Sequence, residues 1–347
     1  METNKKIYVF LIVVTTVVVC IYAQSIILPF ILAILFWFLI RVMKKILAKV
    51  KFVGRAPQWL LTVFSTLLLI GFLVLAVSMI SNNISELSKA LPKYEANVKQ
   101  VTNSINERFD IDLKNLLGDY SEDINFGSIL SSIFSTLTGL FGNAFTVLLY
   151  LVFLLLEEPI FPKKLRAMYP DQKRYKHVTD LVNKIDHSIG NYVALKTLTS
   201  LMTGFLSYFA LYFIGIDAPI FWAFLIFVLN FIPTIGSLIA TLFPTLFAVL
   251  QFGDLTPGIL VLAIVGVIQM IIGNAVEPRL MGNSLNISPL VVFLTLAAWG
   301  AIWGISGMLL SVPITVILIL IMSEFPGTQP IAILLSQRGN INTEQKD

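Results

Sequence analysis

The chain has 347 residues, of which 57% are apolar and 13% are charged. Soluble domains carry roughly 45–50% apolar and about 25% charged residues, so this composition excludes an ordinary soluble enzyme. The net charge is +4, and the basic residues lie in short blocks between apolar runs. Such blocks are typical of loops that orient membrane helices, not of a nucleic-acid interface. The sequence therefore predicts an all-α, polytopic helical membrane protein with no nucleic-acid partner.

Residues 1–80 are expected to form three transmembrane helices. Residues 7–40 carry no charge, and Gln24 and Ser25 interrupt this run just before Pro29, which predicts a hairpin of two helices. The next segment, residues 41–55, contains six basic residues and no acidic one. A short basic loop of this kind stays in the cytoplasm, so the N-terminus is expected there too.

The third span ends near residue 80 and leads into a hydrophilic, net-acidic segment, residues 81–127, expected outside the cytoplasm. Its apolar residues alternate at spacings of three and four, which indicates a heptad helix. They are Ile84, Leu87, Leu91, Tyr94, Val98, Val101 and Ile105. We favour packing of this helix against its own protein over a seam between subunits. Pro92 is expected to start or kink it.

A fourth span, residues 128–156, is expected to return the chain to the cytoplasm. The linker that follows, residues 157–190, holds seven basic against five acidic residues and both histidines, which we expect to be solvated. The C-terminal core, residues 191–323, contains only five charges: Lys196, Asp217, Asp254, Glu277 and Arg279. Lys196 is expected to extend to the lipid headgroups. The tail, residues 324–347, is expected in the cytoplasm.

Residues 219–252 are too long for one straight span of about 20 residues, and Asn230–Gly236 interrupts them. Pro233 has no backbone N–H, so the carbonyl of Leu229 loses its helical partner. Such a backbone survives at membrane depth only where protein or a wet cavity satisfies it. Asn230 beside this break predicts a substrate-binding discontinuous helix, and a proline kink held by packing is the alternative.

Residues 287–322 repeat the pattern, interrupted at residues 300–307 and followed by Pro313. Between the two broken segments lies one intact span, residues 258–276. This order predicts two re-entrant hairpins around a central helix, with kinked spans as the alternative, and about eight transmembrane segments in all. The expected translocation site comprises Asn230, Pro233, Gly236, Gln269, Asn274, Glu277, Arg279, Gly300, Gly304 and Gly307.

Four stretches resemble the autoinducer-2 exporter family, also called the PerM permeases. They are residues 28–33 (LPFILA), 231–236 (FIPTIG), 277–282 (EPRLMG) and 288–309, which starts with SPL and ends with GISGML. The last two are the most specific, and the resemblance covers almost the whole chain. It implies about eight transmembrane segments, export of small signalling molecules in some members, sodium or lithium/proton antiport in others, and a homo-oligomer.

No enzymatic site is expected. Gly304, Ser306 and Gly307 match the G-x-S-G of rhomboid proteases, but Ser306 would need an intramembrane histidine as its base. The chain holds no H-E-x-x-H and no phosphate-binding G-x-x-x-x-G-K loop. We therefore expect no catalytic residue, no metal and no cofactor, and transport that uses a gradient.

The two interruptions predict a transporter, and the resemblance implies that it lies in a bacterial inner membrane. We expect it to export a small polar solute such as an autoinducer-2-like signalling molecule, because amide and carbonyl groups suit a neutral, hydroxyl-rich ligand. One alternative is Na⁺(Li⁺)/H⁺ antiport, with Glu277 as proton carrier. A second is a non-transporting membrane scaffold of the cell envelope or of sporulation.

Glu277 and Arg279 lie on either side of Pro278 at the end of the intact span. Charges so close to an apolar run need partners, and the candidates are each other and the open ends of the neighbouring half-helices. The pair is either an interfacial anchor or a gate that holds the hairpins closed on one side.

Overall fold

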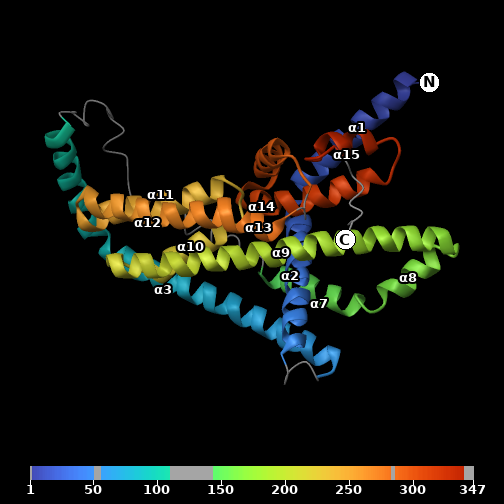
Figure 1. Ribbon diagram of the computed structural model, residues 1–347, viewed down its shortest axis with the longest axis horizontal. Helices are drawn as coiled ribbons and strands as arrows, with labels where there is room; N and C mark the ends of the chain where they lie inside the picture. Colours follow the sequence, from blue (N-terminus) through green and yellow to red (C-terminus); the bar gives the residue numbers. More distant parts are fainter. Residues whose placement is uncertain (1, 51–55, 110–143, 283–285, 340–347) are drawn as a thin grey trace. The chain divides into compact units, whose positions relative to one another are not determined.

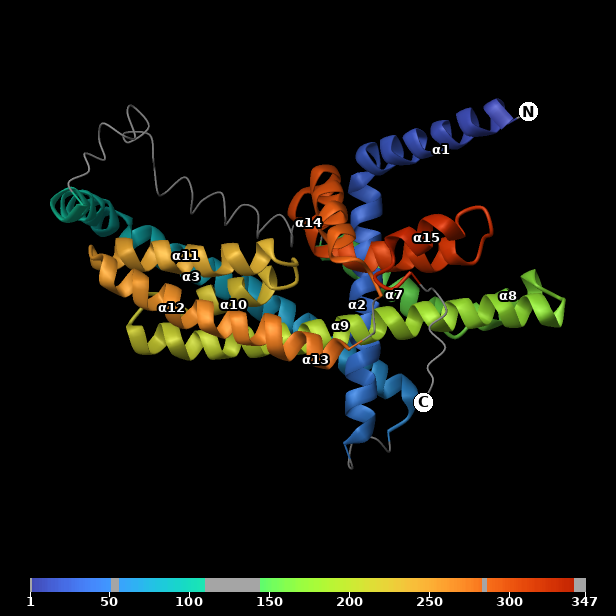
Figure 2. The ribbon, with the colours of Figure 1, turned by 45° about the horizontal axis from the view of Figure 1, so that its top comes forward.

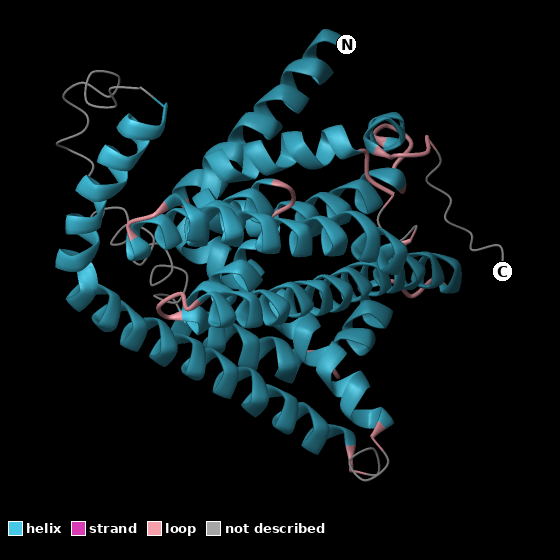
Figure 3. Ribbon diagram, turned by 60° about the vertical axis from the view of Figure 1, so that its left-hand side comes forward, coloured by secondary structure: helices cyan, strands magenta, loops and turns pink. Residues whose placement is uncertain are grey.

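The computed structural model describes residues 2–50, 56–109, 144–282 and 286–339, with side chains described for all of these except 2–6, 8–10, 84–86, 88–93, 95–96 and 98–109. In this part of the chain every regular element is a helix, so the all-α expectation is confirmed (Figures 1 and 3). The helices are α1 (Glu2–Tyr22), α2 (Gln24–Lys49), α3 (Gln58–Phe109), α7 (Ala144–Glu157), α8 (Phe161–Met168), α9 (Gln172–Ile214), α10 (Pro219–Leu229), α11 (Ile235–Phe252), α12 (Leu255–Ile271), the π turn η1 (Ile272–Val276), α13 (Glu277–Met281), α14 (Pro289–Ser323) and α15 (Gln329–Leu335).

Six of the described helices are long and apolar enough to cross a membrane, or seven when α7 and α8, bent by 65°, count as one broken span. This count covers the described residues alone, so the expected eight spans stay a prediction. The described residues also contain two shorter apolar helices, Leu11–Tyr22 within α1 and Pro219–Leu229.

The chain divides into two compact units, and each is made of separate stretches of sequence. Unit 1 comprises Met1–Thr66, Gly142–Ala194 and Asn283–Asp347, and unit 2 comprises Leu67–Phe141 and Leu195–Gly282. Helices α3 and α9 contribute to both. The linear division expected from the sequence stays a prediction.

The N-terminal hairpin expected in unit 1 is wrong, because α1 ends at Tyr22, α2 begins at Gln24, and only Ala23 lies between them. The Ala23 N–H donates to the Val19 carbonyl and the Ile27 N–H to the Ala23 carbonyl, so the two helices meet end to end at a corner and do not fold back side by side (Figure 2). Helix α2 packs along α7, where the rings of Phe30 and Tyr150 meet edge to face at 5.7 Å. A charged cluster joins the other end of α2 to α7 and α9, because the Arg41 guanidinium pairs with Asp186 and lies 3.5 Å from Glu158. The fourth span ends at Glu157, as expected, while its expected first half lies outside the described residues.

Unit 2 is a group of antiparallel helices in which α10, α11 and α12 lie side by side (Figures 1 and 2). Its core includes a buried aromatic pair, because the Trp222 ring on α10 lies 4.9 Å from the Phe247 ring on α11. The Asp254 carboxylate accepts the N–H of Thr256 and so caps the start of α12. These contacts fix the helices on which most of the predicted site residues lie.

The predicted heptad helix is the continuation of the third span, since α3 runs without interruption through Pro92. Leu87 and Tyr94 are each 1% exposed. The Tyr94 hydroxyl donates to Asp217 at 2.8 Å, and its ring packs 5.2 Å from Phe247. Packing against its own protein is therefore confirmed at the described heptad positions. Residues 110–127 lie outside the described part.

Candidate functional site

The structure places the predicted site residues in two groups. Unit 2 holds Asn230, Pro233, Gly236, Gln269, Asn274, Glu277 and Arg279, whereas Gly300, Gly304 and Gly307 lie in unit 1. The expectation that both breaks line one site stays a prediction.

The first break is a tight reversal between α10 and α11. A Cβ built on Gly236 would overlap the carbonyl oxygen of Leu229, seven residues earlier, so the chain folds back on itself here. The Leu229 carbonyl is not left open, as the sequence had suggested, because it accepts the N–H of Ile232 at 2.9 Å. Thr234 adopts φ 58°, which is unusual for a residue with a side chain.

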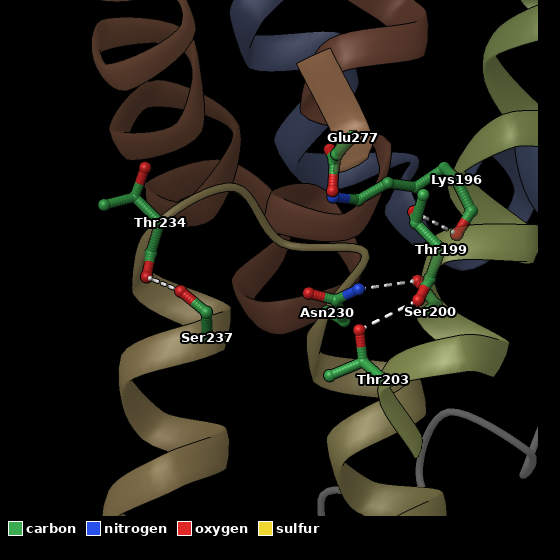
Figure 4. Close-up of polar contacts among 8 residues, drawn as sticks. All are labelled: Lys196, Thr199, Ser200, Thr203, Asn230, Thr234, Ser237 and Glu277. Atoms are coloured by element: carbon green, nitrogen blue, oxygen red, sulfur yellow. Dashed lines mark hydrogen bonds and ion pairs between the residues drawn. The ribbon is translucent and has the colours of Figure 1, made fainter. Parts of the chain in front are cut away.

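Asn230 ends α10 and points at α9 (Figure 4). Its side-chain amide donates to the Ser200 hydroxyl at 3.1 Å, and the two residues are 6% and 0% exposed. The helices approach closely beside this contact, since a Cβ on Gly204 would lie 2.9 Å from the Ala223 carbonyl oxygen. A small residue at this position lets the polar groups of α9 and α10 meet.

Lys196 lies one helical turn before Ser200 on the same face of α9. Its ammonium group lies 2.6 Å from the Glu277 carboxylate, with side chains 6% and 19% exposed (Figure 4). The headgroup-facing orientation expected for Lys196 is therefore wrong, because its charge is neutralised inside the protein. The pairing of Glu277 with Arg279, one of the two arrangements expected, is wrong, because Glu277 pairs with Lys196 while Arg279 is exposed.

Glu277 takes its position from an irregular turn. Its backbone N–H donates to Ile272, five residues earlier, which is the π-helical pattern, and the following Pro278 has no N–H to donate. Single π turns inside α-helices are frequent at functional sites. Asn274, also in this turn, is exposed and so lies away from the buried contacts around Glu277.

Gln269 lies on the buried face of α12 and is 9% exposed. Its Nε2 has no hydrogen-bond partner among the described residues. Leaving a buried amide donor unpaired costs about 1–3 kcal/mol, so a polar ligand or water there would stabilise it. We use the name polar seam for Lys196, Ser200, Asn230 and Glu277, with Gln269 as a neighbour on the adjoining helix α12.

The polar seam carries one positive and one negative charge, so its net charge is zero. Replacing a buried ion pair by apolar residues is often neutral or stabilising, which makes such a pair weak evidence for a structural role. Ionisable residues inside transmembrane segments are usually functional. The described residues contain no group of three His, Cys, Asp or Glu side chains able to hold a metal ion.

The second break, in unit 1, is also a reversal in which a glycine packs against a backbone carbonyl. Trp303 and Gly304 leave helical geometry, with φ −128° and 61°, and a Cβ on Gly307 would overlap the Trp299 carbonyl oxygen. The Trp303 indole N–H donates to the Cys20 carbonyl at 2.9 Å and ties this reversal to α1. Gly300 lies against Met308, where a Cβ would come within 2.8 Å of the methyl carbon.

Sequence reasoning gave Lys196 no role in the site and did not name Ser200. The sequence held a signal for them, because Lys196, Ser200, Thr203 and Ser207 follow one another at three- and four-residue steps in the mostly apolar second half of α9. All four are buried.

Comparison with known proteins identifies relatives that are transport proteins. The family described as AI-2E family transporter matches residues 9–327. The AI-2 transport protein TqsA of Escherichia coli K12 is 32% identical over 319 residues, covering 91% of this chain and 90% of that protein. A putative transport protein of Haemophilus influenzae is 30% identical over 325 residues, covering 90% of each. A sodium-lithium/proton antiporter of Halobacillus andaensis is 23% identical over 241 residues, covering 67% of each.

Proposed function

The chain belongs to the AI-2E transporter family, and we propose that it moves a small, neutral, polar solute such as an autoinducer-2-like molecule through the polar seam of unit 2. It is thus a multi-pass membrane transport protein and not an enzyme. One observation carries the proposal about the site: the buried Lys196–Glu277 pair lies one turn from the buried Ser200–Asn230 hydrogen bond.

The chemistry of the seam favours a neutral ligand. Lys196 and Glu277 cancel each other's charge, so a strongly anionic or cationic solute would meet no net countercharge. The seam instead offers an ammonium donor, a carboxylate acceptor, a hydroxyl and an amide, and the unpaired Gln269 amide lies on the next helix. A hydroxyl-rich molecule can hydrogen-bond to all of these groups.

We further propose that α10–α11 in unit 2 and the two halves of α14 in unit 1 are each a re-entrant hairpin. Two observations support this: α10 has only 11 residues, and both reversals bring a glycine against a carbonyl seven or eight residues earlier. From the placement of basic loops we propose that both termini are cytoplasmic, and from the family resemblance that the protein is a homo-oligomer.

Sodium or lithium/proton antiport is the second candidate, and the buried ion pair also favours it. Protonation of Glu277 would break its pairing with Lys196, so proton binding and opening of the seam would be coupled. The similarity to the Halobacillus andaensis antiporter supports this candidate over part of the chain.

Purified protein in proteoliposomes distinguishes these functions. We expect flux of neutral polar metabolites, chosen from a panel that includes autoinducer-2, with or without coupled proton movement recorded by an internal pH dye. Proton movement strictly coupled to Na⁺ or Li⁺ with no metabolite flux would establish antiport instead. No flux of either kind would contradict both proposals and favour a scaffold.

A further inference from the structure

The short helix α8 leaves the line of α7 at a bend of 65°, just beyond the apolar part of that helix (Figure 1). Where α7 lies across the membrane, such a bend turns α8 toward the membrane plane. The following loop is short, because α9 begins at Gln172. Helix α8 and the start of α9 therefore form one surface at the membrane boundary, all of it within unit 1.

Helix α8 has two faces. Phe161, Leu165 and Met168 share one side at helical spacing, and Lys163 and Arg166 lie on the other. Leu165 packs inward, while Phe161 and Met168 are 45% and 70% exposed. An amphipathic helix with exposed apolar residues on one face and basic residues on the other lies in the lipid interface.

This surface is strongly positively charged. Residues 161–176 contain one acidic residue, Asp171, against six basic residues: Lys163, Lys164, Arg166, Lys173, Arg174 and Lys176. All six are exposed. Lys164 pairs with Glu157, and the Arg166 guanidinium lies over the Tyr175 ring, 4.9 Å from its centre. Arg166 thereby holds α8 against the first turn of α9.

We propose that the surface formed by α8 and the first turns of α9 binds the headgroups of anionic phospholipids. The exposed Phe161 and Met168 enter the acyl-chain boundary, and the basic residues contact lipid phosphates. Each basic residue near an anionic membrane surface contributes a preference of roughly five-fold. This role is independent of the solute that the protein moves.

The test uses the full chain with one fluorescent label. In a Cys20→Ser background, Met168→Cys carries an environment-sensitive dye, and the protein is reconstituted with a minor fraction of brominated lipid. We expect brominated phosphatidylglycerol to quench this dye several-fold more than brominated phosphatidylcholine. Equal quenching by the two lipids, or quenching by neither, would overturn the proposal.

Two sets of substitutions separate charge from folding. Changing Lys163, Lys173, Arg174 and Lys176 to Gln should abolish the preference for phosphatidylglycerol, while Lys163→Arg, Lys173→Arg and Lys176→Arg together should keep it. Lys164 and Arg166 stay unchanged because they have partners within the protein. A preference that survives the Gln variant contradicts the assignment.

A second label position serves as the matched control. Phe213 is 80% exposed and lies at the opposite end of α9, far in sequence from the basic cluster. A dye on Phe213→Cys should be quenched equally by the two brominated lipids. A phosphatidylglycerol preference of the same size at both positions would mean general enrichment of anionic lipid, and would also overturn the proposal.

Discussion

The Lys196 ammonium group lies 2.6 Å from the Glu277 carboxylate and joins α9 to the start of α13 across 81 residues of sequence. Both groups are largely shielded from solvent. Neither charge can therefore be removed alone without leaving the other unpaired.

Single and double substitutions of this pair should differ in a characteristic way. Lys196→Met or Glu277→Gln alone is expected to lower the free energy of unfolding by about 3 kcal/mol, because one buried charge loses its partner. The double variant should be more stable than either single variant. Denaturant titration in detergent measures all four proteins, and strictly additive losses would contradict the pairing.

Alkaline pH should weaken the attachment of α3 to the rest of unit 2. Burial, and then the hydrogen bond and charge of Asp217, raise the pKa of Tyr94 above its ordinary value of 10.0. The stabilisation by this tyrosine is therefore complete below pH 10 and declines as pH rises further. The thermal midpoint of the wild type should exceed that of Tyr94→Phe near neutral pH, and the gap should shrink above pH 10. A gap that widens there would refute this linkage.

The two helix reversals should not tolerate a methyl group. Gly236→Ala and Gly307→Ala each place a Cβ on a backbone carbonyl, so each should destabilise the protein by at least about 1–3 kcal/mol. Gly71→Ala, where no atom lies within 4 Å, is the matched control and should be close to neutral. Folded yield and unfolding midpoint in detergent give the comparison, and wild-type behaviour of both reversal variants would argue against this geometry.

Arg41 should not be replaceable by lysine. Its guanidinium group pairs with both Asp186 and Glu158 and lies over the Trp37 ring, 4.8 Å from the ring centre. One ammonium group cannot make all three contacts. Arg41→Lys is expected to cost about 1–3 kcal/mol of stability. Lys45→Gln on the same helix, where the side chain is exposed, should change little. Equal midpoints for the two variants would exclude a structural role for the cluster.

Much of the fold could be predicted because it depends on local sequence. Long charge-free runs give membrane helices, Gln24 marks the first corner, and the breaks at Asn230–Gly236 and residues 300–307 follow from glycine and proline chemistry. The heptad pattern placed Tyr94 against its own protein for the same reason.

The partner of Glu277 could not be found in this way. Arg279 is two residues away and Lys196 is 81 residues away, and sequence proximity favours the wrong one. Only the packing of α9 against the end of α12 brings Lys196 within reach.

Solute flux through Asn230 variants tests the central claim most directly. Asn230→Ala removes the bond to Ser200 in the seam, whereas Ser237→Ala removes a hydroxyl that only bonds locally to the Thr234 carbonyl (Figure 4). With equal amounts of folded protein in proteoliposomes, we predict that Asn230→Ala loses most of the initial rate and that Ser237→Ala keeps it. Wild-type flux in Asn230→Ala, and in Lys196→Met combined with Glu277→Gln, would contradict transport through the polar seam.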